Sequence, residues 1–174
     1  MERERFWTLP NVVSLSRLGL AVVFVLTSSM PWRLALVGIA STTDYLDGWL
    51  ARRRGGPSRW GNLIDPISDR AFALAAITTL AVEGLVSPVE AFVFLSRDLA
   101  TGLGFLAAQR IEVLKGVRFV ARFPGKVVTV VQFLLLVGAI TAPRHVDALV
   151  MVLAGVSAVA IVDYTWALWS ARKR

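Results

Sequence analysis

The sequence contains no cysteine, and its 174 residues include a single histidine, His145. Without cysteine, disulfide bonds, thiolate catalysis and cysteine-ligated metal sites are all excluded. Acidic residues are also few, with 12 Asp and Glu against 19 Lys and Arg, so the formal net charge is +7. We assign no role to His145. These absences narrow the chemistry but do not determine the cellular compartment.

Apolar residues make up 56% of the chain, and the mean hydropathy is +0.64. That value is high for a soluble domain, which must present a polar surface. The excess of basic residues would suit nucleic acid in a soluble protein, but here these residues sit between long apolar runs. Anionic lipid and orientation in a bilayer explain them better. The composition therefore predicts an integral membrane protein that does not bind nucleic acid.

The apolar runs have the length that a bilayer requires, roughly 17 to 25 residues. We expect six transmembrane helices, at residues 11–28, 31–52, 62–85, 88–109, 125–141 and 146–169. No small-residue cleavage site of a signal peptide is evident, so we expect the first span to be retained. The predicted fold is an all-α bundle that forms a single domain over residues 1–174.

The distribution of basic residues between the spans predicts the orientation of the bundle. If the first terminus is cytoplasmic, fourteen basic residues face the cytoplasm and two, Arg33 and Arg144, face the opposite side. Both termini are then expected in the cytoplasm, and an even number of spans is supported. We expect a multi-pass protein of the inner (cytoplasmic) membrane. The cytoplasmic set is Arg3, Arg5, Arg52, Arg53, Arg54, Arg59, Arg110, Lys115, Arg118, Arg122, Lys126, Arg172, Lys173 and Arg174.

Four aspartates stand close together in the sequence, at Asp44, Asp47, Asp65 and Asp69. The first two are three residues apart and the last two are four apart, so on helices each pair lies on one face. A basic, Gly- and Pro-containing connector at residues 52–60 separates the pairs. An aspartate at the centre of a membrane helix costs roughly 2.5 to 3.5 kcal/mol, and less near the interface. Four of them therefore indicate a site, facing the cytoplasm.

An oxygen-rich, cysteine-free site suits hard cations such as Mg²⁺ or Mn²⁺. Two such ions can bind a pyrophosphate, and a remaining carboxylate can take a proton from an attacking hydroxyl. This chemistry is phosphoryl transfer. The small residues Gly48, Ala51 and Gly61 leave room for a nucleotide head group, and Arg52 is placed to meet phosphate.

The spacing of these residues resembles the signature of the CDP-alcohol phosphatidyltransferases at every specified position. The resemblance implies a bundle of six transmembrane helices, usually as a homodimer. It also implies that the chain transfers a phosphatidyl group from CDP-diacylglycerol to an alcohol and releases CMP. The matching pattern is Asp44-x2-Asp47-Gly48-x2-Ala51-Arg52-x8-Gly61-x3-Asp65-x3-Asp69.

The same resemblance assigns roles to the residues of the pattern. Asp44, Asp47 and Asp65 are expected to hold divalent metal, in two ions per site, on the CDP pyrophosphate. Asp69 is the expected general base, in contact with metal as well. Asn11-x2-Ser14-x2-Arg17 resembles the amino-terminal box of the family, which lies near the nucleotide. The CDP-binding set is then Arg17, Asp47, Gly48, Ala51, Arg52 and Gly61.

The second half of the chain carries the residues expected to bind the acceptor alcohol. Basic residues gather there, as they would around an anionic acceptor; those we select are Arg97, Arg118, Arg122 and Lys126. Ser96-Arg97-Asp98 and Gly125-Lys126-x2-Thr129-x2-Gln132 resemble, more loosely, the phosphatidylglycerophosphate synthases and the related cardiolipin synthases. Glycerol 3-phosphate is therefore the leading acceptor. Asp98 stands where the former commonly have Glu, which keeps phosphatidylglycerol as an alternative; an inositol phosphate is the third.

Two readings without catalysis compete with this one. The aspartates could form salt bridges between helices with Arg17, Arg70 or Arg97, in a membrane scaffold, or line the path of a cation transporter. Salt bridges alone would not require Gly48 and Ala51 at their offsets from the aspartates.

Overall fold

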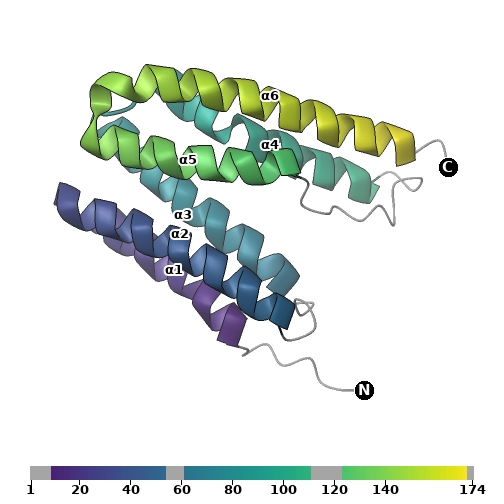
Figure 1. The fold of residues 1–174 in the computed structure, drawn as a ribbon, viewed down its shortest axis with the longest axis horizontal. Helices are drawn as coiled ribbons and strands as arrows, with labels where there is room; N and C mark the ends of the chain where they lie inside the picture. The colour runs from purple at the N-terminus through teal and green to yellow at the C-terminus, as the bar shows by residue number, and fades with distance from the viewer. Residues whose placement is uncertain (1–8, 54–60, 111–122, 172–174) are drawn as a thin grey trace. The chain divides into compact units, whose positions relative to one another are not determined.

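The computed structural model describes residues 9–53, 61–110 and 123–171, and the regular structure within these ranges is entirely helical (Figure 1). Each predicted helix is confirmed, with ends within three residues of those expected. The elements are α1 (Leu9–Leu26), α2 (Met30–Arg53), α3 (Gly61–Val82), α4 (Pro88–Arg110), α5 (Phe123–Thr141), the short 3₁₀ helix η2 (Pro143–His145) and α6 (Val146–Ala171).

The largest difference from the expected ends is at α3, which ends at Val82 instead of continuing to residue 85. Gly84 adopts a positive φ of 76°, a conformation that glycine accepts without steric cost. The amides of Gly84 and Leu85 donate to the carbonyls of Ala81 and Leu80, the two bonds of a Schellman cap. The glycine therefore terminates the helix inside an apolar run.

The start of α4 is fixed by a capping box. The Ser87 amide donates to Glu90 Oε2 at 2.6 Å, and the Glu90 amide donates to Ser87 Oγ at 3.3 Å. Two otherwise unpaired amides at the helix start are satisfied in this way. Pro88 follows the serine as the first helical residue, where its missing N–H costs nothing.

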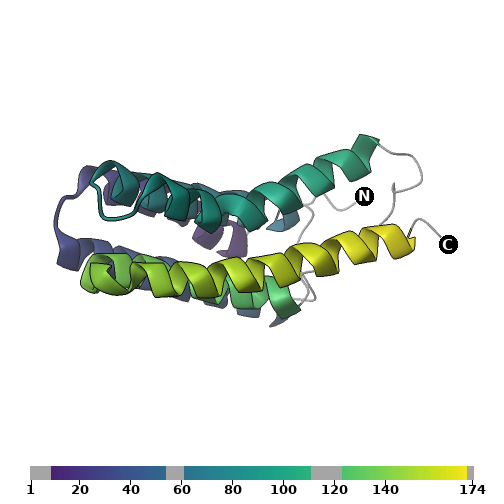
Figure 2. The same cartoon turned by 90° about the horizontal axis from the view of Figure 1, so that it is seen from above.

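The helices form two compact units, one up to Leu85 and one from Val86. In the first unit, α1 packs against both α2 and α3. In the second, α6 packs against both α4 and α5, and η2 joins α5 to the antiparallel α6. Figure 1 and Figure 2 both show α4 and α6 running in the same direction. Each unit is thus a three-helix bundle.

Each unit has an apolar core of its own. In the first, the rings of Phe24 and Phe72 meet edge to face with centroids 5.9 Å apart. In the second, Phe94 of α4 is fully buried together with Leu135 of α5 and Leu153 of α6. The large side chains in these two cores hold the helices of each unit together. The outer faces of the same helices are apolar as well.

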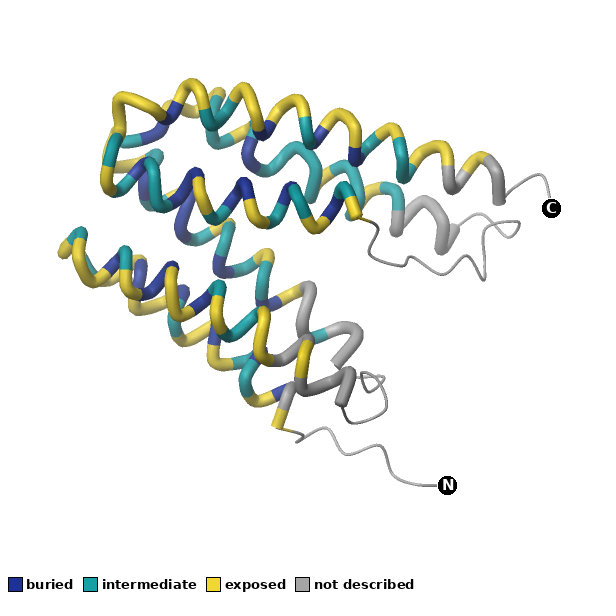
Figure 3. The backbone as a smooth tube through the Cα atoms, in the orientation of Figure 1, coloured by how far each residue is buried: buried dark blue, intermediate teal, exposed yellow. Residues whose placement is uncertain are grey.

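The outer faces of the helices are rich in large apolar side chains. Figure 3 colours many positions along α6 as exposed. Within the described residues, the segments Phe123–Thr141 and Pro143–Trp166 are long and apolar enough to cross a membrane. Only 22% of the apolar window in the second is buried, unlike the core helix of a soluble protein. A membrane protein is consistent with this surface. The six spans and the cytoplasmic termini stay predictions.

Arg33 lies inside the first unit. Its side chain is 1% exposed, and its guanidinium pairs with both carboxylate oxygens of Glu83, with 2.7 Å between Arg33 Nη2 and Glu83 Oε1. The guanidinium carbon also lies 5.3 Å from the centroid of the Phe24 ring, a cation–π distance. The pair connects the start of α2 to the turn that follows α3.

Candidate functional site

A buried polar stripe on α1 forms the floor of the candidate site. Asn11, Ser14 and Arg17 are each no more than 1% exposed. Their spacing of three residues places them on one face of the helix, and buried Ala21 and Phe24 continue the same face. This face packs against α2 and α3. The amino-terminal half of the stripe is therefore polar where the other half is core.

Arg17 brings together two of the four aspartates. Its Nη1 donates to Asp44 Oδ1 on α2 at 3.0 Å. The same nitrogen forms an ion pair with Asp69 Oδ1 on α3. One guanidinium of α1 thus connects carboxylates of α2 and α3. The two aspartates are separated by 25 positions in the sequence. One member of each aspartate pair therefore meets the other at the Arg17 guanidinium.

The three side chains differ in their exposure. Arg17 is 1% exposed, whereas the side chains of Asp44 and Asp69 are each 38% exposed. A buried guanidinium is tolerated only when it is paired and hydrogen-bonded, and the two carboxylates supply that pairing. The carboxylates themselves remain accessible from outside the unit. The arrangement resembles a half-open site more than a buried salt bridge.

The other two aspartates lie one turn away, at the same end of the helices. Asp47 follows Asp44 in α2, about 4.5 Å further along the axis, and Asp65 precedes Asp69 in α3 by about 6 Å. Because α2 and α3 run in opposite directions, both steps lead toward the connection between these helices (Figure 1). The backbone therefore places all four positions at one end of the first unit.

Several predicted site residues are described only by their place in a helix. Gly48, Ala51 and Arg52 lie in the last turns of α2, and Gly61 begins α3. The side-chain surroundings of these residues, and of Asp47 and Asp65, lie outside the described part of the structure. Among the side chains that are described, His, Cys, Asp and Glu form no group of three that could hold a metal. That finding leaves the four-aspartate site untested.

Ser68 is a residue of this region that sequence reasoning missed. It is 1% exposed and directly precedes Asp69, and its hydroxyl has no hydrogen-bond partner among the described residues. A single serine within a helix gives no signal in the sequence, because serine is common on both buried and exposed faces. We assign it no chemical role.

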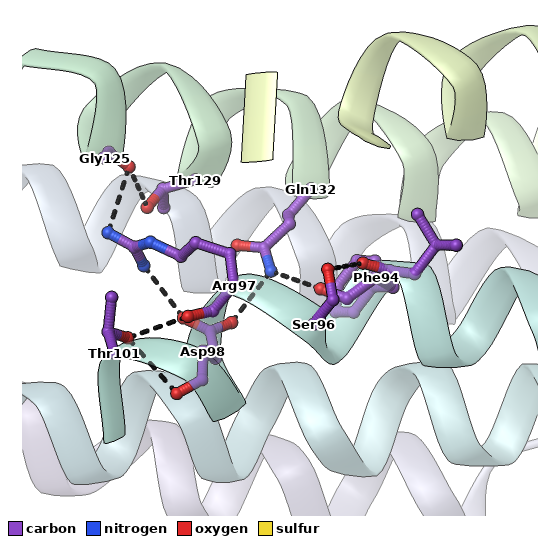
Figure 4. A network of polar contacts seen from close by, with 9 residues as sticks. Phe94, Ser96, Arg97, Asp98, Thr101, Gly125, Thr129 and Gln132 are labelled. Carbon is purple, nitrogen blue, oxygen red and sulfur yellow. Dashed lines mark hydrogen bonds and ion pairs between the residues drawn. The ribbon is translucent and has the colours of Figure 1, made fainter. Parts of the chain in front are cut away.

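A second polar cluster, in the other unit, contains the predicted acceptor residue Arg97 (Figure 4). Arg97 Nη1 donates to Asp98 Oδ1 at 2.8 Å, and Nη2 donates to the Gly125 carbonyl at 3.4 Å. Gln132 Nε2 donates to Asp98 Oδ2 at 2.8 Å. The side chains of Arg97 and Asp98 are each 14% exposed. The loosely matched pattern of the second half therefore marks a real contact between α4 and α5.

The other predicted acceptor residues are not part of this cluster as described. Lys126 follows Gly125 in the first turn of α5 and is exposed. Arg118 and Arg122 lie outside the described residues. The proposed acceptor-binding role of all four basic residues stays a prediction.

Comparison with known proteins gives a consistent set of relatives. The sequence profile of the CDP-alcohol phosphatidyltransferase family matches residues 7–162. A probable phosphatidylglycerophosphate synthase of Mycobacterium tuberculosis is 30% identical over 93% of this chain and 82% of its own. The CDP-diacylglycerol--glycerol-3-phosphate 3-phosphatidyltransferase of Bacillus subtilis is 30% identical over 74% of both chains. A cardiolipin synthase (CMP-forming) of Rattus norvegicus is 28% identical over 80% of this chain.

The extent of these matches differs between relatives. The chain spans about half the length of several of them, between 50% and 56% for the cardiolipin synthases and one of the glycerol-3-phosphate enzymes. Two matches, those from Mycobacterium tuberculosis and Bacillus subtilis, extend over most of both chains.

Proposed function

Since this chain belongs to the CDP-alcohol phosphatidyltransferase family, we propose that it is a phospholipid-synthesising transferase. It moves a phosphatidyl group from CDP-diacylglycerol to the hydroxyl of an alcohol and releases CMP. The observation that carries the proposal is the contact of Arg17 with Asp44 and Asp69. This contact places two half-exposed carboxylates of the family pattern side by side.

The residues present fit the divalent metal on which the family generally depends. Asp44 and Asp69 offer oxygen donors that are 38% exposed and come from two helices, α2 and α3, that both pack against α1. Hard cations such as Mg²⁺ and Mn²⁺ prefer such donors. With Asp47 and Asp65 in the next turn, the four carboxylates would hold two ions. When bound, the ions would neutralise the charge of the CDP pyrophosphate.

The side chains of the site then have separate tasks. Asp69 accepts the proton of the acceptor hydroxyl at a carboxylate oxygen. The hydroxyl oxygen forms a bond to the β-phosphorus of CDP-diacylglycerol, and the bond between that phosphorus and the bridging oxygen breaks, so CMP leaves with the bond's electron pair. The buried guanidinium of Arg17 holds Asp69 in position relative to Asp44. Gly48, Ala51, Gly61 and Arg52 surround the nucleotide.

Glycerol 3-phosphate is the proposed acceptor, and phosphatidylglycerophosphate is the product. The two relatives matched over most of both chains support this choice, since their names refer to phosphatidylglycerophosphate and to glycerol 3-phosphate. Arg97, Arg118, Arg122 and Lys126 are the proposed ligands of its phosphate. The cardiolipin synthase relatives keep phosphatidylglycerol as the second candidate.

The setting of the reaction is part of the proposal. We propose one domain of six spans in the inner membrane, with both termini and the aspartates at the cytoplasmic side, and a homodimer as the working form. The apolar outer faces of the helices support a bilayer environment. The fourteen-to-two distribution of basic residues supports the orientation.

Release of CMP by the purified protein tests the proposal. The protein is supplied with CDP-diacylglycerol and Mg²⁺ and, separately, glycerol 3-phosphate, phosphatidylglycerol, inositol phosphate or serine. We expect stimulation by glycerol 3-phosphate and none in excess chelator. Stimulation by phosphatidylglycerol alone would replace the first acceptor by the second. Silence with all four, in protein shown to be folded, would leave the scaffold or transporter reading.

The variant Asp69→Asn tests the assignment of the base. It should lose at least about 100-fold in CMP release, the low end of the contribution of a general base, while it remains folded. Asp147→Asn is the matched control, because Asp147 is an exposed carboxylate in the first turn of α6, in the other unit. Normal turnover by Asp69→Asn would remove Asp69 from the mechanism.

A further inference from the structure

Gln132 of α5 is a buried amide with both of its N–H groups engaged. It is 6% exposed, and its Nε2 donates to the Phe94 carbonyl and to Asp98 Oδ2, each at 2.8 Å. A side-chain amide nitrogen carries two hydrogens, so these two bonds use it fully. Both acceptors belong to α4. Gln132 therefore fixes the position of the Asp98 carboxylate relative to α5.

Asp98 passes this constraint on to Arg97. Its Oδ2 accepts from Gln132, while its Oδ1 accepts from Arg97 Nη1 at 2.8 Å (Figure 4). The carboxylate plane is thus held at both ends. An arginine on its own has many rotamers, and charge-assisted bonds of this kind restrict it to one of them. The side chains of Gln132, Asp98 and Arg97 are thus joined by a continuous series of hydrogen bonds that leads from α5 to α4.

Gly125 provides the space that the guanidinium occupies. A Cβ at this position would lie 2.6 Å from Arg97 Nη2 and 3.1 Å from the hydroxyl oxygen of Tyr164. Side chains from α4 and α6 therefore both meet the backbone of α5 at its first turn. The Gly125 carbonyl also accepts from Arg97 Nη2. Any larger residue at position 125 must displace the end of the Arg97 side chain.

The guanidinium keeps donors that these contacts do not use. A guanidinium has five N–H groups, and Arg97 Nε has no hydrogen-bond partner among the described residues. The side chain also retains 14% of its exposure. A positive group beside the start of a helix is disfavoured by the helix dipole, so the carboxylate of Asp98 is needed to hold it there. The unfavourable placement of the Arg97 charge at this helix start is explained if the protein needs the charge there.

We propose that Gln132 and Gly125 are positioning residues for Arg97: Gln132 holds it through Asp98, and Gly125 supplies the space against the first turn of α5. The inference rests on the proposed function, in which Arg97 binds the anionic part of the acceptor. In that role the network fixes where the acceptor phosphate binds and leaves the CDP-diacylglycerol site unaffected. The expected signature is a rise in the KM for the acceptor alone.

Gln132→Leu and Gly125→Ala test the two halves of this proposal in the full-length protein. Each should raise the KM for glycerol 3-phosphate about tenfold, because a displaced guanidinium no longer meets the phosphate in the right geometry. The KM for CDP-diacylglycerol should stay within about twofold. Gly125→Ala is expected to fold, because alanine is favoured over glycine within helices and the atom it meets most closely ends a flexible side chain.

Two glycines supply matched controls. Gly155→Ala places its Cβ in open space on α6, and Gly138→Ala places it 2.5 Å from Leu149 Cδ1, in the contact between α5 and α6. The first should change neither KM. The second disturbs helix packing without touching Arg97. It should therefore lower the thermal midpoint and leave the acceptor KM nearly unchanged. An acceptor KM raised equally by Gly138→Ala and Gly125→Ala would overturn the proposal in favour of a general packing effect.

Failure of this inference is separable from failure of the proposed function. If the unaltered protein releases no CMP with any acceptor, the proposed function fails, and this inference fails with it. If that protein is active but Gly125→Ala leaves the acceptor KM unchanged, only the positioning role is wrong. Should Gln132→Leu not fold, the result with Gly125→Ala decides. Arg97→Ala must itself raise the acceptor KM, and an unchanged value would also refute the inference.

Discussion

Replacement of Arg17 by methionine is the most informative perturbation of the candidate site. Methionine keeps an unbranched apolar chain in place of the aliphatic stem of arginine, but it removes the charge that lies between Asp44 and Asp69. Two carboxylates from different helices would then face each other without a cation between them. The expected result is separation of α2 from α3 at this end of the first unit, together with loss of activity.

The magnitude follows from the exposures. Removing one partner of a fully buried ion pair costs about 3 to 5 kcal/mol. Here Arg17 is 1% exposed but each aspartate is 38% exposed, so water compensates part of the loss, and exposed pairs are worth at most about 1 kcal/mol. We therefore expect a loss of about 2 kcal/mol. For a chain of this size that corresponds to a decrease in Tm of roughly 4 to 8 °C.

Thermal unfolding of the detergent-solubilised protein measures this loss, beside Arg17→Lys as the matched variant. Lysine keeps the charge but presents a single ammonium instead of a planar fork, so an intermediate Tm is expected. Equal Tm values for Arg17→Met and the unaltered protein, with CMP release intact, would refute the reasoning, since the contact would then have neither a structural nor a functional effect.

The remaining predictions concern stability, metal and orientation. Arg33→Met should lower stability by about 1 to 2 kcal/mol through loss of the Glu83 and Phe24 contacts, while both KM values stay unchanged, because Asp44 lies about 16 Å further along α2; an altered KM would argue against this separation. Mg²⁺ at about 100 times its Kd should raise stability by about 2.7 kcal/mol, and Asp44→Asn should abolish that rise; an equal rise in the variant would exclude Asp44 as a ligand. Because the chain has no cysteine, Arg144→Cys should react with an impermeant thiol reagent on intact cells and Arg3→Cys only after permeabilisation; the reverse pattern would invert the predicted orientation.

The extent of each helix was predictable because it depends on local sequence. Long apolar runs bounded by polar connectors gave each helix to within three residues. Even the end that was wrong, at α3, has a local cause in Gly84, which stops the helix inside an apolar run. Hydropathy alone does not register such a cap, because Leu85 and Val86 continue the apolar sequence beyond the glycine.

Contacts between helices were predictable only as sets of candidates. Arg17, Arg70 and Arg97 were equivalent as partners for the aspartates, and the structure pairs Arg17 with two of them while Arg97 pairs with Asp98. Arg33 gave no sign of burial, because its partner Glu83 is 50 residues away. The choice between such partners depends on how the helices are rotated against each other, which a single sequence does not determine.

The contact of Arg17 with two aspartates also bears on whether the cluster is only a structural salt bridge. One guanidinium against two carboxylates leaves a formal charge of −1, and Asp47 and Asp65 in the next turn would bring it to −3. A purely structural pair needs one carboxylate, and every further one adds repulsion. Several carboxylates gathered at one end of the helices are instead what a site for divalent cations requires. Asp44→Asn should therefore leave the metal-free protein as stable as before, or more so, because the Asn carbonyl can still accept from Arg17. A structural salt bridge predicts the opposite, a lower Tm in the absence of metal.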